Sequence, residues 1–161
     1  MAADLSRVGV ATPIGHLTVV VSPDGVVCTT TDDPASLDDV LGARPVERRH
    51  RAIAQEIAAY FAGRRRSFAT APDLRLVTTP FARAVLERTV EIPYGEMATY
   101  GDVAAAAGRP GAARAAGTAL RRSPIELFVP CHRVVPAGPG YGRYGGHEDR
   151  RTFLLRLEGA I

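Results

Sequence analysis

The sequence predicts an α+β protein: a small N-terminal β-sheet unit with one helix over residues 1–76, then a helical C-terminal unit over residues 77–161 that contains a helix-turn-helix. Two observations lead to this prediction. The first part holds short β-branched runs separated by Pro and Gly, and the second holds apolar residues at helical spacing between cap and stop signals. With 161 residues, 46% of them hydrophobic, the chain can bury the core of one domain or of two small ones.

Three strands are expected first, over Val8–Ala11, Leu17–Ser22 and Val26–Thr31. Pro and Gly at residues 13–15 and 23–25 favour turns between them, which predicts a three-stranded antiparallel meander. Residues 32–46 are expected to form a loop, and Glu47–Ala62 a helix because its apolar residues recur at helical spacing. Residues 64–77 are expected to be an irregular link.

The second part begins with Thr79 as a cap and Pro80 at the first helical position, and this helix is expected to run to Glu91. Thr99 precedes Asp102 by three residues, a capping-box spacing that predicts a short helix ending at Gly108.

A second short helix is expected over Ala112–Arg122 after a turn at residues 109–111, so the pair suggests a helix-turn-helix. The second helix is rich in small residues, which would let it approach another surface closely. A glycine-rich loop over residues 138–146 and a last helix over Glu148–Glu158 complete the prediction.

Positive charge is concentrated in the C-terminal part. The net charge is +3, and six Arg lie between Val103 and His147 against the single acid Glu126: Arg109, Arg114, Arg121, Arg122, Arg133 and Arg143. Such a stretch suits a phosphate-binding face, and an ordinary solvated surface is the alternative.

The composition also sets limits. No apolar run approaches the length of a membrane span, and Met1–Val8 lacks the pattern of a secretory signal, so we expect a cytoplasmic, nucleoid-associated protein. Cys28 and Cys131 are then expected to be free thiols, and two cysteines do not make a Cys-rich zinc site. No metal and no cofactor is expected.

Cys131 is the candidate nucleophile. It follows the apolar, strand-like run Leu127–Val129 and lies between Pro130 and His132. The thiolate is the reactive form of cysteine, and a nearby imidazole can take its proton directly or through a water. Neighbours on an extended chain point in opposite directions, so this pairing needs a tight turn at Pro130 or a bridging water. The alternative is a buried structural cysteine beside a surface histidine.

Glu158 is the candidate third member. It lies in the last turn of the final helix, where the helix dipole disfavours an acid, and it follows Leu154 by four residues. An acid that faces inward there could orient a histidine, as the third member of a triad does. The alternative is a solvated acid beside Gly159.

The chain resembles the O6-alkylguanine-DNA alkyltransferase family over nearly its whole length, most strongly from Pro80 to Gly159. Pro130-Cys131-His132-Arg133-Val134 matches the active-site motif of that family. Further matches in order and spacing are Ile92-Pro93-Tyr94-Gly95-Glu96, Tyr100-Gly101, Pro110-Gly111-Ala112-Ala113-Arg114-Ala115, Gly117, Tyr144-Gly145-Gly146 and Leu154-Leu155-Arg156-Leu157-Glu158.

The resemblance implies a reaction. Cys131 would accept the alkyl group irreversibly, His132 would deprotonate it through a water, and Glu158 would hold the imidazole. Tyr100 would help rotate the phosphate backbone and donate a hydrogen bond to N3 of the leaving guanine. The product thioether has no route back to the thiol, so one molecule would act once.

The resemblance also implies how DNA is bound. The partner would be double-stranded DNA carrying O6-alkylguanine, bound by a monomer in the minor groove through the helix Ala112–Arg122, with cooperativity left open. Arg114 would fill the gap left by the flipped-out nucleotide. The other implied DNA contacts are Thr99, Tyr100, Ala112, Ala113, Ala115, Gly117 and Arg121, and the implied base pocket is Pro130, Val134, Tyr144 and Gly145.

One position departs from the family. An Asn usually stands before the Pro that follows the recognition helix and braces the turn beside the active site, whereas this chain has Ser123 and no Asn anywhere. Two alternatives stay open beside the transferase, and Ser123 motivates the first of them. One is a non-reacting module that recognises the alkyl lesion and signals to another repair pathway. The other is a transcription regulator that uses the helix-turn-helix.

Overall fold

The computed structural model describes residues 4–141 and 148–161, and its internal contacts group into two compact units. The first comprises Met1–Leu76 together with Pro124–Phe128, and the second comprises Val77–Ser123 together with Val129–Ile161. The division into two consecutive domains at residue 76 stays a prediction, but by contact the short segment Pro124–Phe128 belongs with the first unit.

The α+β class and the N-terminal meander are confirmed. Strands β1 (Ser6–Thr12), β2 (Gly15–Ser22) and β3 (Gly25–Thr30) pair antiparallel in sequence, with Val8 opposite Val19 and Val20 opposite Cys28. A fourth, short strand, β4 (Val46–Glu47), pairs parallel with β1, so the strand order is β3-β2-β1-β4 in the described part of the chain.

The expected loop over residues 32–46 is wrong, because it contains α1 (Ala35–Leu41) and the start of β4. Asp33 accepts a hydrogen bond from the backbone N–H of Ala35 at 3.0 Å, and Gly42 ends the helix in the left-handed conformation. Leu37 is its one buried residue and packs into the sheet core, so seven residues with a single buried position gave no periodic signal. The described part of this unit therefore has two helices rather than the predicted one.

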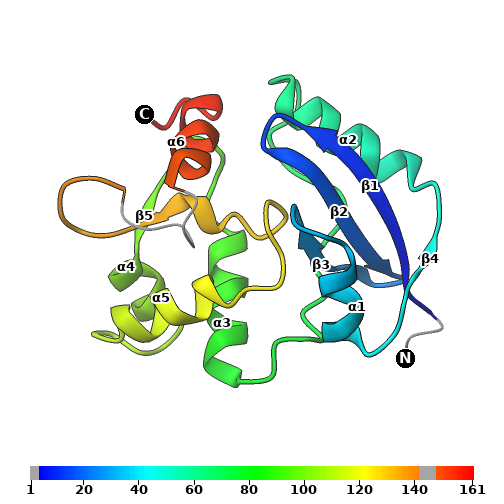
Figure 1. Ribbon diagram of the computed structural model, residues 1–161. Coiled ribbons are helices and arrows are strands. Elements are labelled where there is room, and N and C mark those ends of the chain that lie inside the picture. The colour runs from blue at the N-terminus through cyan, green and yellow to red at the C-terminus, as the bar shows by residue number, and fades with distance from the viewer. Residues whose placement is uncertain (1–3, 142–147) are drawn as a thin grey trace. The chain divides into compact units, whose positions relative to one another are not determined.

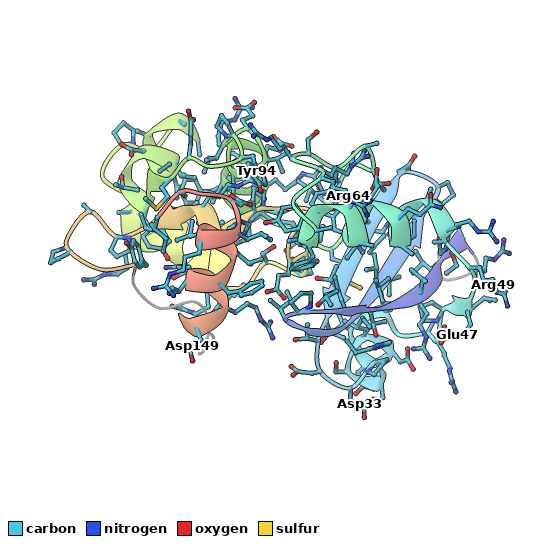
Figure 2. All side chains as sticks on the ribbon, turned by 90° about the horizontal axis from the view of Figure 1, so that it is seen from above. Asp33, Glu47, Arg49, Arg64, Tyr94 and Asp149 are labelled. Carbon is cyan, nitrogen blue, oxygen red and sulfur yellow. The ribbon has the colours of Figure 1, made fainter. Side chains whose placement is uncertain are left out.

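Helix α2 (Arg51–Phe61) begins later than the predicted Glu47, because Val46 and Glu47 pair with β1 instead. It contacts β1 along the sheet (Figure 1). Figure 2 labels Arg49 just before this helix and Arg64 just after it, and their side chains mark its two ends. Of the four apolar positions predicted from helical spacing, Ile53, Ile57 and Tyr60 are buried, whereas Phe61 is only half-buried.

The segment Pro124–Phe128 is fixed to the first unit at the open edge of β3. The backbone N–H of Thr29 donates to the carbonyl of Pro124 at 2.9 Å, and the Thr29 hydroxyl accepts from the N–H of Glu126 at 2.8 Å. The rings of Phe68 and Phe128 pack with centroids 4.4 Å apart. This segment connects the end of α5 to the residues just before Cys131, so the chain runs through the first unit immediately before the candidate site.

The second unit is largely helical, as predicted. Helices α3 (Pro80–Val90), α4 (Tyr100–Ala106) and α5 (Ala113–Arg121) contact one another as a group (Figure 1). Thr79 caps α3 by accepting from Ala82, and the predicted capping box at α4 is confirmed, since Thr99 accepts from the N–H of Asp102 and Asp102 accepts from the N–H of Thr99. Helices α4 and α5 follow each other with a turn over residues 107–112 and are the two helices of the predicted helix-turn-helix.

A two-stranded parallel pairing was not predicted: β5 (Ala98–Thr99) lies beside β6 (Val134–Val135). Two residues each are too short for an alternating pattern to be recognised. The last helix, α6 (Glu148–Leu157), ends one residue before the predicted Glu158. Asp149, labelled in Figure 2, is an exposed residue of its first turn.

Candidate active site

Cys131 lies just after two tight turns rather than after a strand, so the expectation of a strand-like run at Leu127–Val129 is wrong. Leu127 has a positive φ of 73°, and Phe128 donates back to the carbonyl of Glu126 at 2.8 Å, which makes a γ-turn. Burial of Leu127 holds this strained conformation.

The tight turn expected at Pro130 is present. Pro130 has φ −79° and ψ 64°, the inverse γ-turn conformation, and the N–H of Cys131 donates to the carbonyl of Val129 at 2.8 Å. One turn of 3-10 helix, η2 (Cys131–Arg133), follows, and Cys131 and His132 are both buried in it. The turn and the 3-10 geometry replace the extended chain that would have sent adjacent side chains in opposite directions.

His132 is paired with Glu158. The ring atom Nε2 lies 2.8 Å from Oε2 of Glu158, and both side chains are completely shielded from solvent. Glu158 follows α6 directly and its N–H donates to the carbonyl of Leu154, so the end of that helix aims the carboxylate inward. The predicted proximity of these two residues is therefore found. The other ring nitrogen, Nδ1, is also buried.

Arg133 is a member of this cluster that the sequence did not reveal. Its Nε donates to Oε1 of Glu158 and its Nη2 to Oε2, both at 2.8 Å, while Nη1 donates to the carbonyl of Ile92 at 2.7 Å. Arg133 was counted among the basic residues of a phosphate-binding face, but it is buried and paired, so it does not belong to an exposed face. The inward-facing acid was the signal, since a buried carboxylate requires a cation or several donors.

A turn before β5 encloses the end of α6. The hydroxyl of Tyr94 donates to the carbonyl of Leu157 at 3.2 Å, and the guanidinium of Arg133 lies 5.8 Å from the centre of the Tyr94 ring. Gly95 has φ 83°, and a Cβ there would come within 3.1 Å of the Glu158 carbonyl oxygen, so glycine is needed at this position. Figure 2 labels Tyr94 in this second unit. The turn thus fixes the residue that carries the carboxylate.

Tyr100 lies in the first turn of α4 and is half-buried. Its hydroxyl oxygen accepts a hydrogen bond from Nη2 of the buried Arg151 at 3.2 Å, and Arg151 also donates to the carbonyl of Tyr141. A Cβ added to Gly117 would meet the Tyr100 ring at 3.7 Å. Gly117 was expected to allow close approach to DNA, and within the protein it leaves space for this ring.

The predicted DNA-binding residues lie on or near α5. Arg114, Ala115 and Arg121 are exposed, whereas Ala116 and Leu120 are the buried face of the helix. The implied contacts that are half-buried are Thr99, Ala112, Ala113 and Gly117. The side chain of Thr99 is used in the capping box, and the hydrogen bond from its N–H lowers the pKa of Asp102. The DNA-contact roles of all these residues stay predictions.

The implied base pocket is described only in part. Pro130 and Val134 are both buried, and Val134 is held in β6 by pairing with Ala98. Tyr144 and Gly145 lie outside the described residues, as does most of the glycine-rich loop. Ser123 follows α5, is half-buried, and donates its N–H to the carbonyl of Leu120 at 3.1 Å.

Within residues 4–141 and 148–161, no three His, Cys, Asp or Glu side chains are grouped so that they could hold a metal ion. None of the helices in that part of the chain is long and apolar enough to cross a membrane. Both cysteines are free thiols.

A buried cysteine next in the chain to a histidine that a buried glutamate holds is the arrangement expected of a cysteine nucleophile and its base. Residues 80–160 match the family model described as the DNA binding domain of 6-O-methylguanine DNA methyltransferase. The chain belongs to this methyltransferase family.

Similar proteins cover different shares of the chain. The methylated-DNA–protein-cysteine methyltransferase of Methanosarcina acetivorans is 43% identical over 112 residues, 68% of this chain and 69% of that protein. The protein of the same name from Mycobacterium leprae is 46% identical over 103 residues, 64% and 61% of the two chains. The crystal structure of Mycobacterium tuberculosis O6-methylguanine methyltransferase superposes with a TM-score of 0.85 at 33% identity, over 97% of this chain and 93% of that one. A complex of that mycobacterial protein with DNA superposes with a TM-score of 0.82.

Proposed function

We propose that this protein is a methylated-DNA–protein-cysteine methyltransferase that repairs DNA by moving the O6-alkyl group of guanine onto its own Cys131. Family membership supports the class of reaction. The observation that carries the proposal to particular residues is the buried pair of His132 and Glu158, in which His132 follows the buried Cys131 in the chain. An acceptor cysteine needs a base that removes its proton, and a carboxylate that holds the base supplies the orientation.

The proposed reaction is a single nucleophilic displacement at the alkyl carbon. The Cys131 thiol gives its proton to Nδ1 of His132 through a water, and the Sγ lone pair attacks the alkyl carbon. The carbon–O6 bond breaks, its electron pair stays on the guanine, and Tyr100 donates toward N3 of the leaving base. The new thioether has no good leaving group, so the thiol is not regenerated and each molecule reacts once.

Because Cys131 is buried, the substrate base must leave the DNA helix to reach it. The side chain lies inside the second unit and cannot reach a base that is stacked in a duplex, so the guanine must rotate out of the helix at a cost of a few kcal/mol. The exposed Arg114 on α5 is suited to occupy the vacated position, and the small residues around it allow the helix to enter the minor groove. The protein acts on O6-alkylguanine in double-stranded DNA as a monomer.

The test is a mass measurement. Incubation with excess duplex carrying O6-methylguanine should add one methyl group, about 14 Da from covalent transfer, to Cys131 and none to Cys28. Cys131→Ser keeps nearly the same volume but replaces the thiol with a far less acidic hydroxyl, so it should bind the duplex and gain no mass. Turnover beyond one equivalent would exclude this mechanism.

The same experiment separates the alternatives. A protein that binds methylated duplex tightly but gains no mass would be a lesion-binding module, the outcome expected if Ser123 has removed a required contact. Preference for a particular unmodified sequence over methylated DNA would indicate a regulator.

A further inference from the structure

Arg133 is buried in the site, yet neither the proton transfer nor the alkyl transfer uses it. We propose that Arg133 is a positioning residue for that reaction: it holds the Glu158 carboxylate ionised and in one orientation, which keeps His132 neutral with Nδ1 as its proton acceptor. This inference rests on the proposed function for its kinetic consequence, but not for its structural one.

The geometry fixes the carboxylate from two sides. Arg133 forms a two-pronged contact with Glu158, one donor on each carboxylate oxygen at 2.8 Å, the strongest arrangement for this pair. The remaining guanidinium nitrogen, Nη1, donates to the carbonyl of Ile92 at 2.7 Å and so fixes the position of the Arg133 side chain. The N–H of Gly95 also reaches Oε1 of Glu158 at 3.5 Å. These donors form a clamp, made by Arg133 and the N–H of Gly95, that holds the carboxylate in one orientation toward His132.

The clamp determines which ring nitrogen of His132 carries hydrogen. The guanidinium of Arg133 donates to both oxygens of Glu158 at 2.8 Å, and a cation so close favours the ionised form of the carboxylate. An ionised carboxylate can only accept hydrogen bonds, and its Oε2 lies 2.8 Å from Nε2 of His132. Nε2 must therefore donate, and in the neutral ring Nδ1 is left with the lone pair that takes the thiol proton.

The clamp also keeps the ring neutral. Arg133 and Glu158 together carry no net charge, so the buried imidazole lies beside a neutralised pair rather than beside a bare anion. Without Arg133, the Glu158 carboxylate would be a lone buried charge and would favour protonation of His132. An imidazolium has no lone pair and cannot deprotonate Cys131. Tyr94 also faces the cluster, but its hydroxyl donates to the Leu157 carbonyl and is not a competing charge.

The kinetic test uses free O6-benzylguanine, which requires neither DNA binding nor base rotation. Single-turnover rates would be measured from about pH 5.5 to 9 for the wild type, Arg133→Met and Arg133→Lys. Arg88→Met is the matched control, because Arg88 pairs with Glu91 on the exposed surface of α3. We expect Arg133→Met to move the acidic limb of the pH–rate profile upward by about one pH unit. Its rate should fall about tenfold at pH 6.5 and recover toward the wild-type rate at pH 9.

Lysine keeps the positive charge but lacks the planar guanidinium that contacts both carboxylate oxygens. Arg133→Lys should therefore leave the midpoint of the acidic limb near that of the wild type and lower the plateau, and Arg88→Met should change neither. An Arg133→Met profile with an unmoved midpoint and only a lower plateau would overturn the inference, because loss of packing alone predicts that result.

A second measurement holds even if these variants fail to fold. In wild-type protein labelled with ¹⁵N-histidine, the two ring nitrogens of His132 are distinguishable by chemical shift, and His132→Gln assigns its signals among the four histidines. We expect a neutral ring at pH 7 with hydrogen on Nε2. Hydrogen on Nδ1, or a charged ring, would overturn the inference. Absence of transfer to both benzylguanine and methylated DNA would contradict the proposed function instead, while the ring state would still decide the role of Arg133.

Discussion

Restoring an amide at position 123 should speed alkyl transfer without changing DNA affinity. Ser123 follows α5, and its N–H donates to the carbonyl of Leu120 at 3.1 Å. The next residue, Pro124, begins the segment that is fixed to β3 by the N–H of Thr29 at 2.9 Å. Position 123 therefore lies in the chain between the proposed recognition helix and the segment that precedes Cys131. Ser123→Asn adds the amide donor and acceptor that the sequence resemblance implies for this turn.

The size of the effect follows from one hydrogen bond. A typical net contribution is about 0.5–1.5 kcal/mol, which corresponds to a rate factor of roughly 2 to 12 if it acts only in the transition state. Because Ser123 is half-buried, water competes for the amide, and we expect the lower end, a factor of about 2 to 4.

The assay is single-turnover transfer from methylated duplex, with duplex affinity measured in parallel. Ser123→Ala is the control, and it should react no faster than the wild type because it adds no donor. Slower transfer by Ser123→Asn together with a lower melting temperature would refute the reasoning, since it would mean that the turn is packed around serine and has no room for the amide.

Three further outcomes are expected. Arg114→Ala should slow repair in duplex DNA about tenfold, or 1.4 kcal/mol, yet leave the reaction with free O6-benzylguanine unchanged, and equal losses on both would assign Arg114 to the fold or pocket. Burial raises the pKa of the Cys28 thiol to about 11, so iodoacetamide at pH 8 should label it only after denaturation. Burial disfavours ionisation of Asp73, but hydrogen bonds from Ser22 and Arg75 outweigh it and lower the pKa of the Asp73 carboxyl. Its stabilisation is then present above about pH 4 and decreases as the pH falls below that value, so Asp73→Asn should lower the urea midpoint at pH 7 and lower it less as the pH is reduced.

Local signals predicted much of the fold. The three meander strands follow from β-branched runs between Pro and Gly, and both caps, Thr79 and Thr99, accept the hydrogen bonds expected of them. The errors fall where an element is short and is stabilised by distant partners. Helix α1 depends on one buried residue, Leu37, and β4 exists because its two residues pair with β1.

The candidate site divides in the same way. The position of His132 next to Cys131, and of Glu158 at the end of the final helix, marked both as candidates. The structure places Nε2 of His132 2.8 Å from Oε2 of Glu158. Nothing local indicated that Arg133 turns inward, because an arginine in a basic stretch is normally solvated. The contact between Arg151 and Tyr100 spans 51 residues of sequence and joins α6 to α4, so it was likewise invisible in the sequence.

By itself the sequence determined the family of the protein and the order of the helices in the second unit, and it named Cys131 and His132 as the candidate nucleophile and base, because these depend on residue identity and on spacing within one or two turns. Only the tertiary structure decided how charge is balanced around the base. A buried carboxylate must find its cation somewhere in space, and which of 20 arginines supplies it depends on where the chain ends α6 and turns after Pro130. The backbone path at Cys131 was likewise decided by the fold, since Pro130 adopts an inverse γ-turn in which the N–H of Cys131 donates to the carbonyl of Val129.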